Sequence, residues 1–132
     1  MSANLIPILW DATLQTLYMV AISAILGTLG GLPLGVFLAC SQRGELLSAP
    51  WINKVLGLAV NATRSVPFII LVVAIIPFTR ALVGTSIGTD AAIVPLTLAA
   101  IPFIARLVEN AIREVDAGLI EAARAMGATP FQ

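Results

Sequence analysis

The sequence predicts an all-α integral membrane protein with three membrane-spanning helices and a short cytoplasmic helix after them. Of its 132 residues, 59% are hydrophobic and only 11% are charged, whereas soluble domains carry about 25% charged residues. A water-soluble fold of this size could not bury so much apolar surface. No charged residue lies between Asp11 and Arg43, a stretch longer than the roughly 20 residues that cross a bilayer.

Composition also narrows the function. The chain has no histidine, a single cysteine, Cys40, and a formal net charge of zero. Histidine is the commonest general base and metal ligand, and one cysteine cannot form an internal disulfide. We therefore expect no catalytic residue, no metal site and no cofactor in this chain, and no nucleic-acid partner.

The first predicted span covers residues 14–40. Gly27, Gly31 and Gly35 recur every four residues, which places them on one helix face. Small residues at this spacing let another helix approach closely in lipid. Pro33 lies within the pattern and is predicted to kink the helix. We interpret the glycine face as a helix-packing surface, with a flexing pathway helix as the alternative.

The second and third predicted spans cover residues 55–76 and 91–107. Both carry prolines, which are Pro67, Pro77, Pro95 and Pro102. Prolines persist in membrane helices where neighbouring protein or water satisfies the freed carbonyls. Helices interrupted in this way are typical of a bundle that lines a passage, and three spans alone are too few to enclose one.

Lysine and arginine in the flanking segments predict the orientation. The N-terminus has none, and the short turn predicted between spans two and three has only Arg80. The other flanks hold Arg43, Lys54, Arg106, Arg113 and Arg124. This distribution predicts an N-terminus outside the cell and a C-terminal segment in the cytoplasm.

Arg64 is the most costly residue to place in a membrane, by about 2.5–3.5 kcal/mol on insertion scales. We expect it on the cytoplasmic side of span two. An intramembrane cation is by default a functional site, which makes Arg64, Ser65 and Pro67 candidate pathway or gate residues. The interpretation that we favour is an anchor, in which Arg64 extends to the cytoplasmic headgroups.

A polar face continues out of span three. It comprises Arg106, Glu109, Arg113 and Asp116. Glu109 and Arg113 form an i, i+4 pair, which contributes only a few tenths of a kcal/mol when exposed. We interpret this face as solvated.

A short helix is predicted next, with Asp116 as its N-cap, a start near Ala117 and Gly127 just after its end. Such a helix is too short to be stable alone in water, so we expect it to dock on a partner. Its alanines keep the surface flat, as a helix that lies in a groove requires. Thr129 and Pro130 then start a further helix close to the last residue, so we expect a longer protein.

Residues 121–127, EAARAMG, resemble the E-A-A-x-x-x-G loop of permease subunits of ATP-binding-cassette (ABC) importers. Similarity to the methionine-uptake permeases of type I extends from about Ala12 to the end. It includes RSVPFIIL at 64–71, IPFTR at 76–80, VGTSIG at 83–88 and PFIAR at 102–106. The family's loop continues into an apolar-x-Leu-Pro element and two further spans, so residues 1–132 correspond to the first part of a five-span permease domain.

The resemblance implies an importer of D- or L-methionine in a bacterial inner membrane. Two copies of the permease would form the pathway, two ATPase subunits would bind ATP and magnesium below it, and a substrate-binding lipoprotein would deliver methionine. The coupling residues that it implies are Glu121, Ala122, Ala123, Met126 and Gly127, in a coupling segment at 117–132. An arginine at Ala123 is predicted to clash in the ATPase groove.

Three alternatives remain at this point. A secondary transporter would carry intramembrane carboxylates, and none falls within the predicted spans. A non-transporting membrane fragment would give no reason for the docking helix. A type I permease for another amino acid is the main competitor, and co-purification with an ATPase would separate the ABC class from the other two.

Overall fold

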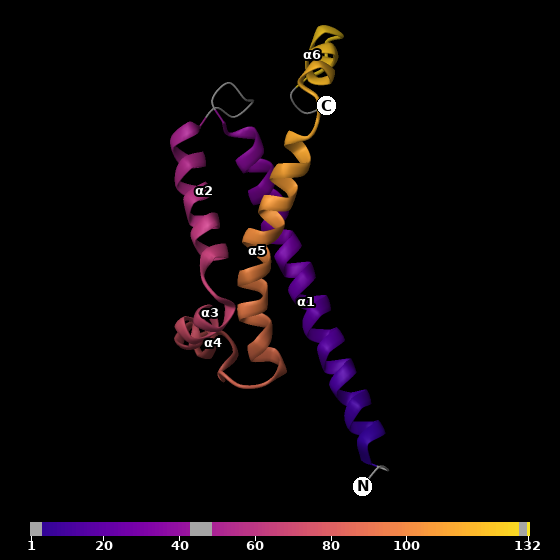
Figure 1. Ribbon diagram of the computed structural model, residues 1–132, viewed down its shortest axis with the longest axis vertical. Coiled ribbons are helices and arrows are strands. Elements are labelled where there is room, and N and C mark those ends of the chain that lie inside the picture. Colours follow the sequence, from indigo (N-terminus) through magenta and orange to yellow (C-terminus); the bar gives the residue numbers. More distant parts are fainter. Residues whose placement is uncertain (1–3, 43–48, 130–131) are drawn as a thin grey trace.

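The computed structural model describes residues 4–42, 49–129 and 132, and no strand occurs among them. Two long helices, α1 (Leu5–Cys40) and α5 (Thr89–Arg113), cross each other along the molecule (Figure 1). Both are long and apolar enough to span a membrane. Each continues through its prolines, Pro33 in α1 and Pro95 and Pro102 in α5, without ending there. All-α architecture with apolar spans is therefore confirmed.

The crossing of α1 and α5 forms the core, and glycine makes it possible. Gly27, Gly31 and Gly35 are all buried. A Cβ atom at Gly31 would lie 2.8 Å from the carbonyl oxygen of Ile101, and one at Gly35 would lie 2.5 Å from that of Ala105. Real Cβ atoms do not approach oxygen so closely, so α5 lies against the bare backbone of α1. The glycine face is thus a helix contact, as small residues in membrane helices allow.

The predicted second span is a bent pair rather than one helix. α2 (Pro50–Ser65) and α3 (Phe68–Ala74) meet at an angle of 105°. Pro67 has no N–H to donate, and Val66 before it is extended, with φ −78° and ψ 128°, because a proline disfavours helical backbone at the preceding residue. The structure therefore holds two long spans, or three if the bent pair counts as one.

A helix replaces the short turn predicted between spans two and three. α4 (Ile76–Val83) has a proline in its first turn and ends at Gly84, whose φ of 84° is left-handed. Pro77, expected to break a span, instead begins α4, where a missing N–H has no cost. α3 and α4 lie beside the half of α5 that is farther from α6 (Figure 1).

Large apolar side chains remain exposed over much of the surface, such as Leu9 at 63%, Ile69 at 70% and Leu107 at 60%. Water would not tolerate so much exposed apolar area. Contact with lipid or with further protein would cover this apolar area. The short helix α6 (Ala117–Ala125) stands apart from the others, beyond the end of α5 (Figure 1).

Candidate functional site

α6 has the bounds that its capping residues predict. The Asp116 carboxylate accepts a hydrogen bond from the Gly118 N–H at 2.6 Å. At the other end Gly127 takes a φ of 88°, a left-handed conformation that glycine adopts without a steric penalty. Local chemistry at both ends therefore defines α6, although α6 contributes no buried residue to the bundle.

The two sides of α6 differ. Leu119, Ile120 and Ala123 line a groove of about 540 Å³ together with residues that follow the helix. Ala122 is exposed, and Met126 is 83% exposed. The predicted coupling residues therefore differ in exposure: Ala123 is half-buried, whereas Glu121, Ala122, Met126 and Gly127 are exposed.

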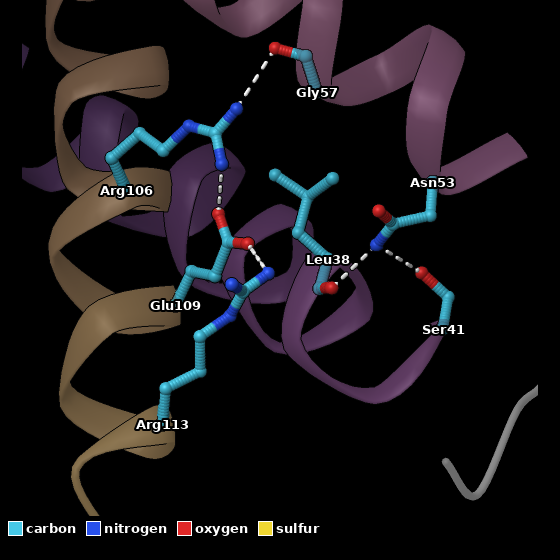
Figure 2. A network of polar contacts seen from close by, with 7 residues as sticks. All are labelled: Leu38, Ser41, Asn53, Gly57, Arg106, Glu109 and Arg113. Carbon is cyan, nitrogen blue, oxygen red and sulfur yellow. Dashed lines mark hydrogen bonds and ion pairs between the residues drawn. The ribbon is translucent and has the colours of Figure 1, made fainter. Parts of the chain in front are cut away.

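A buried ion cluster lies where α5 leaves the bundle toward α6. We define the junction cluster as Arg106, Glu109 and Arg113 of α5 with Gly57 of α2 (Figure 2). The Glu109 carboxylate accepts from both arginines. Arg106 also donates to the carbonyl oxygen of Gly57 at 2.9 Å, which joins α5 to α2.

The interpretation of this face as solvated was wrong for Glu109. That residue is 1% exposed, and the Arg106 side chain is 19% exposed. Arg113, at 46% side-chain exposure, reaches outward, and Asp116 is exposed. The i, i+4 pair between Glu109 and Arg113 is present as predicted, but it is one half of a buried cluster, which helical spacing alone does not reveal.

A second polar contact joins α2 to α1 near the same end. The Asn53 amide donates to the Leu38 carbonyl oxygen at 2.5 Å and to the Ser41 hydroxyl at 2.9 Å (Figure 2). Leu38 and Ser41 are fully buried. Sequence reasoning missed Asn53, Ser41 and Gly57, because their partners lie on another helix and a backbone carbonyl leaves no sequence signal.

The predicted pathway residues lie elsewhere, at the α2–α3 break (residues 64–68). Arg64 is in the last turn of α2, whose 16 residues span about 24 Å. It therefore lies at the end of α2 that is farther from Pro50. Pro67 causes the break, while the Ser65 hydroxyl donates to the Asn61 carbonyl oxygen.

Arg64 is exposed, and among the described residues it makes no hydrogen bond or ion pair. With Phe68 and Phe103 it lines a cavity of about 380 Å³ between the α2–α3 break and α5. The coupling and pathway candidates are thus separate, and the junction cluster lies on the chain path between α6 and the rest of α5. Arg43 and Pro130, used in the sequence analysis, lie outside the described residues.

The described ranges contain no group of three or more histidine, cysteine, aspartate or glutamate residues that could hold an ion. The arrangement consists of a capped and exposed helix, α6, the long helix α5 that precedes it, and polar contacts that join α1, α2 and α5. Such an arrangement can transmit movement from one helix to another.

Known proteins share this arrangement. The chain is 58% identical over 125 residues to the probable D-methionine transport system permease protein MetI of Vibrio cholerae, covering 95% of this chain and 56% of that protein. It is 51% identical over 129 residues to D-methionine transport system permease protein MetI of Escherichia coli K12, covering 96% of this chain and 59% of that protein. The chain thus spans less than two thirds of these relatives.

A solved structure of the MetNI methionine ABC transporter in inward-facing conformations contains a chain with a TM-score of 0.94 and 51% identity. The likeness covers 100% of this chain and 61% of that one. Residues 31–132 also match the family described as binding-protein-dependent transport system inner membrane component. This chain therefore belongs to that family of membrane transport permeases, which is not a family of enzymes.

Proposed function

We propose that the chain is a permease subunit of an ATP-driven importer that carries methionine into the cytoplasm. The complete transporter would contain two permease copies, two ATPase subunits and a substrate-binding lipoprotein in a bacterial inner membrane. The N-terminus would lie outside and α6 in the cytoplasm. Methionine is supported by the relatives, which are named as D-methionine permeases at 51–58% identity.

The observation that carries the proposal is the placement of α6. It is a nine-residue helix, capped at both ends, that projects beyond α5 (Figure 1). A helix of this length is not stable in isolation. Its exposed side, with Ala122 and the 83% exposed Met126, is a small apolar surface of the kind that enters a groove on a partner.

The proposed mechanism needs no covalent chemistry in this chain. ATP and magnesium would be held by the ATPase subunits, and closure of those subunits would displace α6. Because α6 follows α5 after a short connection, α5 would move with it. Along α1 the movement would be a slide of packed helices, which the Cβ-free surface of Gly27, Gly31 and Gly35 permits.

The test places an arginine on the exposed side of α6. Ala123 is half-buried in its own groove, so Ala122→Arg separates docking from folding better than Ala123→Arg. We expect the Ala122→Arg permease to reach the membrane but to lose co-purification with the ATPase and ATP-dependent methionine uptake. Ala117→Arg is the matched control, about 140° around the helix, and should retain both.

Wild-type uptake and ATPase binding in the Ala122→Arg variant would overturn the docking proposal. Substrate identity has its own measurement. Uptake of labelled methionine into vesicles that contain the complete transporter should be competed by unlabelled D- and L-methionine. Stronger competition by a different amino acid would assign the chain to a type I permease for that substrate instead.

A further inference from the structure

In the junction cluster, a cationic side chain of one helix donates a hydrogen bond to the backbone of another helix. Arg106 belongs to α5, yet one of its N–H groups donates a hydrogen bond to the Gly57 carbonyl oxygen of α2. Its guanidinium is held at the same time by Glu109. We propose that Arg106 is a positioning residue that makes α2 follow α5 when α6 moves.

The position of Arg106 is set by burial and charge. Glu109 is 1% exposed, and a buried carboxylate is tolerated only when cations and hydrogen bonds compensate it. Arg106 and Arg113 supply both. Because a guanidinium is a planar fork with five donors, Arg106 can satisfy Glu109 and still donate to a second acceptor.

The second acceptor is the backbone of α2 at Gly57. A Cβ atom there would lie 3.4 Å from the Arg106 Nη2 atom, about van der Waals contact, so the guanidinium packs directly against the α2 backbone. A carbonyl within a helix keeps one lone pair free for such a donor. The contact therefore joins the Arg106 side chain of α5 to the backbone of α2, so on the α2 side it does not depend on a side-chain rotamer.

The contact between Arg106 and Gly57 lies between α6 and the α2–α3 break. α6 starts shortly after Arg113, and α2 ends at the α2–α3 break, where Arg64 lines a cavity against α5. A displacement of α6 thus reaches α5 directly, α2 through Arg106, and the α2–α3 break through α2. The inference rests on the proposed function, since it explains how ATPase movement reaches the pathway candidates.

The experiment compares Arg106→Met with Arg113→Met in the complete transporter. Both variants remove one cation from Glu109, but only the first removes the bridge to α2. We expect Arg106→Met to lower methionine uptake per ATP hydrolysed by about tenfold, the factor that corresponds to one lost charged hydrogen bond. Arg113→Met should keep the wild-type ratio of methionine uptake to ATP hydrolysis. This ratio does not depend on the amount of assembled transporter.

A second measurement follows the helices directly. Spin labels at Lys54 of α2 and Asn110 of α5, both exposed, report the distance between the two helices with and without a non-hydrolysable ATP analogue. The wild type should give one narrow distribution in both states, and Arg106→Met should give a shifted or broadened one with nucleotide. If Arg106→Met does not assemble, Arg106→Lys serves, because it keeps the charge but loses the fork.

Equal uptake ratios and equal distances in Arg106→Met and wild type would overturn the inference. So would equal damage from Arg113→Met, because the effect would then belong to the charge and not to the bridge. Failure of the proposed function is distinguishable. Wild type would then show no ATP-driven methionine uptake, while the label distances would still report whether Arg106 holds α2 to α5.

Discussion

Arg106 and Arg64 occupy opposite environments in one small bundle. Arg106 lies in the junction cluster, where its side chain is 19% exposed and has partners on α5 and α2. Arg64 lies at the α2–α3 break, exposed and without a protein partner among the described residues. Both arginines lie on helices of candidate membrane spans, Arg106 on α5 and Arg64 on α2, which passes as a span only together with α3.

The difference separates a cation that holds structure from one that is available to function. A buried cation with a carboxylate and a carbonyl cannot leave without exposing unpaired charge. A cation that faces a cavity has no such constraint and can meet a substrate, water or a headgroup. Substitutions at the junction cluster should therefore reduce stability, whereas substitutions at the α2–α3 break should reduce transport alone.

The largest effect is expected for Glu109→Ala. It removes the shared acceptor of Arg106 and Arg113 and leaves two cations uncompensated, one of them mostly buried. Breaking such a pair costs about 3–5 kcal/mol. Denaturation of the purified permease in mixed micelles measures it, and Glu121→Ala, which removes an exposed carboxylate, is the control. An equal loss of unfolding free energy in both variants would mean that the junction cluster stabilises the fold no more than an exposed carboxylate does.

Gly35→Ala should follow, at about 1–3 kcal/mol for overpacking. The added Cβ would meet the Ala105 carbonyl oxygen at 2.5 Å and the Val108 Cβ at 2.7 Å, next to the junction cluster. Gly30→Ala is the control, because its Cβ would meet the movable end of Ile101 at 3.1 Å. Thermal unfolding in detergent should rank Gly35→Ala well below Gly30→Ala, and the reverse order would contradict the close contact of α1 with α5.

Asn53→Ala tests the second polar contact at this end. It deletes both hydrogen bonds to α1 and leaves the buried Leu38 carbonyl without that donor, at a cost of about 1–2 kcal/mol. Asn110→Ala changes an exposed asparagine and should leave the unfolding midpoint unchanged. A midpoint equal to that of Asn110→Ala would show that α2 needs no polar attachment to α1.

The smallest effect on stability is expected for Arg64→Gln, within about 0.5 kcal/mol. Methionine uptake by the complete transporter should nevertheless fall severalfold, because the cation of the α2–α3 break is lost. Arg80→Gln, in α4, provides the comparison for loss of an exposed arginine. Normal uptake in Arg64→Gln would identify Arg64 as an anchor and would remove it from the pathway candidates.

Much of the fold follows from the sequence alone. Charge-free length predicts α1 and α5 because the bilayer thickness is fixed. The recurrence of glycine every four residues predicts which face of α1 another helix can approach. Asp116 and Gly127 predict the two ends of α6. These are local properties of the chain, so neighbouring residues are sufficient to read them.

The remaining features depend on residues far apart in sequence. Helical spacing shows that Glu109 and Arg113 can pair, but only the approach of α1 and α2 buries Glu109 and places Gly57 within reach of Arg106. A proline at position 67 predicts an interruption, but not the 105° bend between α2 and α3. Sequence alone therefore determined the long helices α1 and α5, the glycine face of α1 and the ends of α6, but not the division of residues 50–83 into α2, α3 and α4. The tertiary structure decided which charges are buried, because burial is a property of the neighbours that packing brings together.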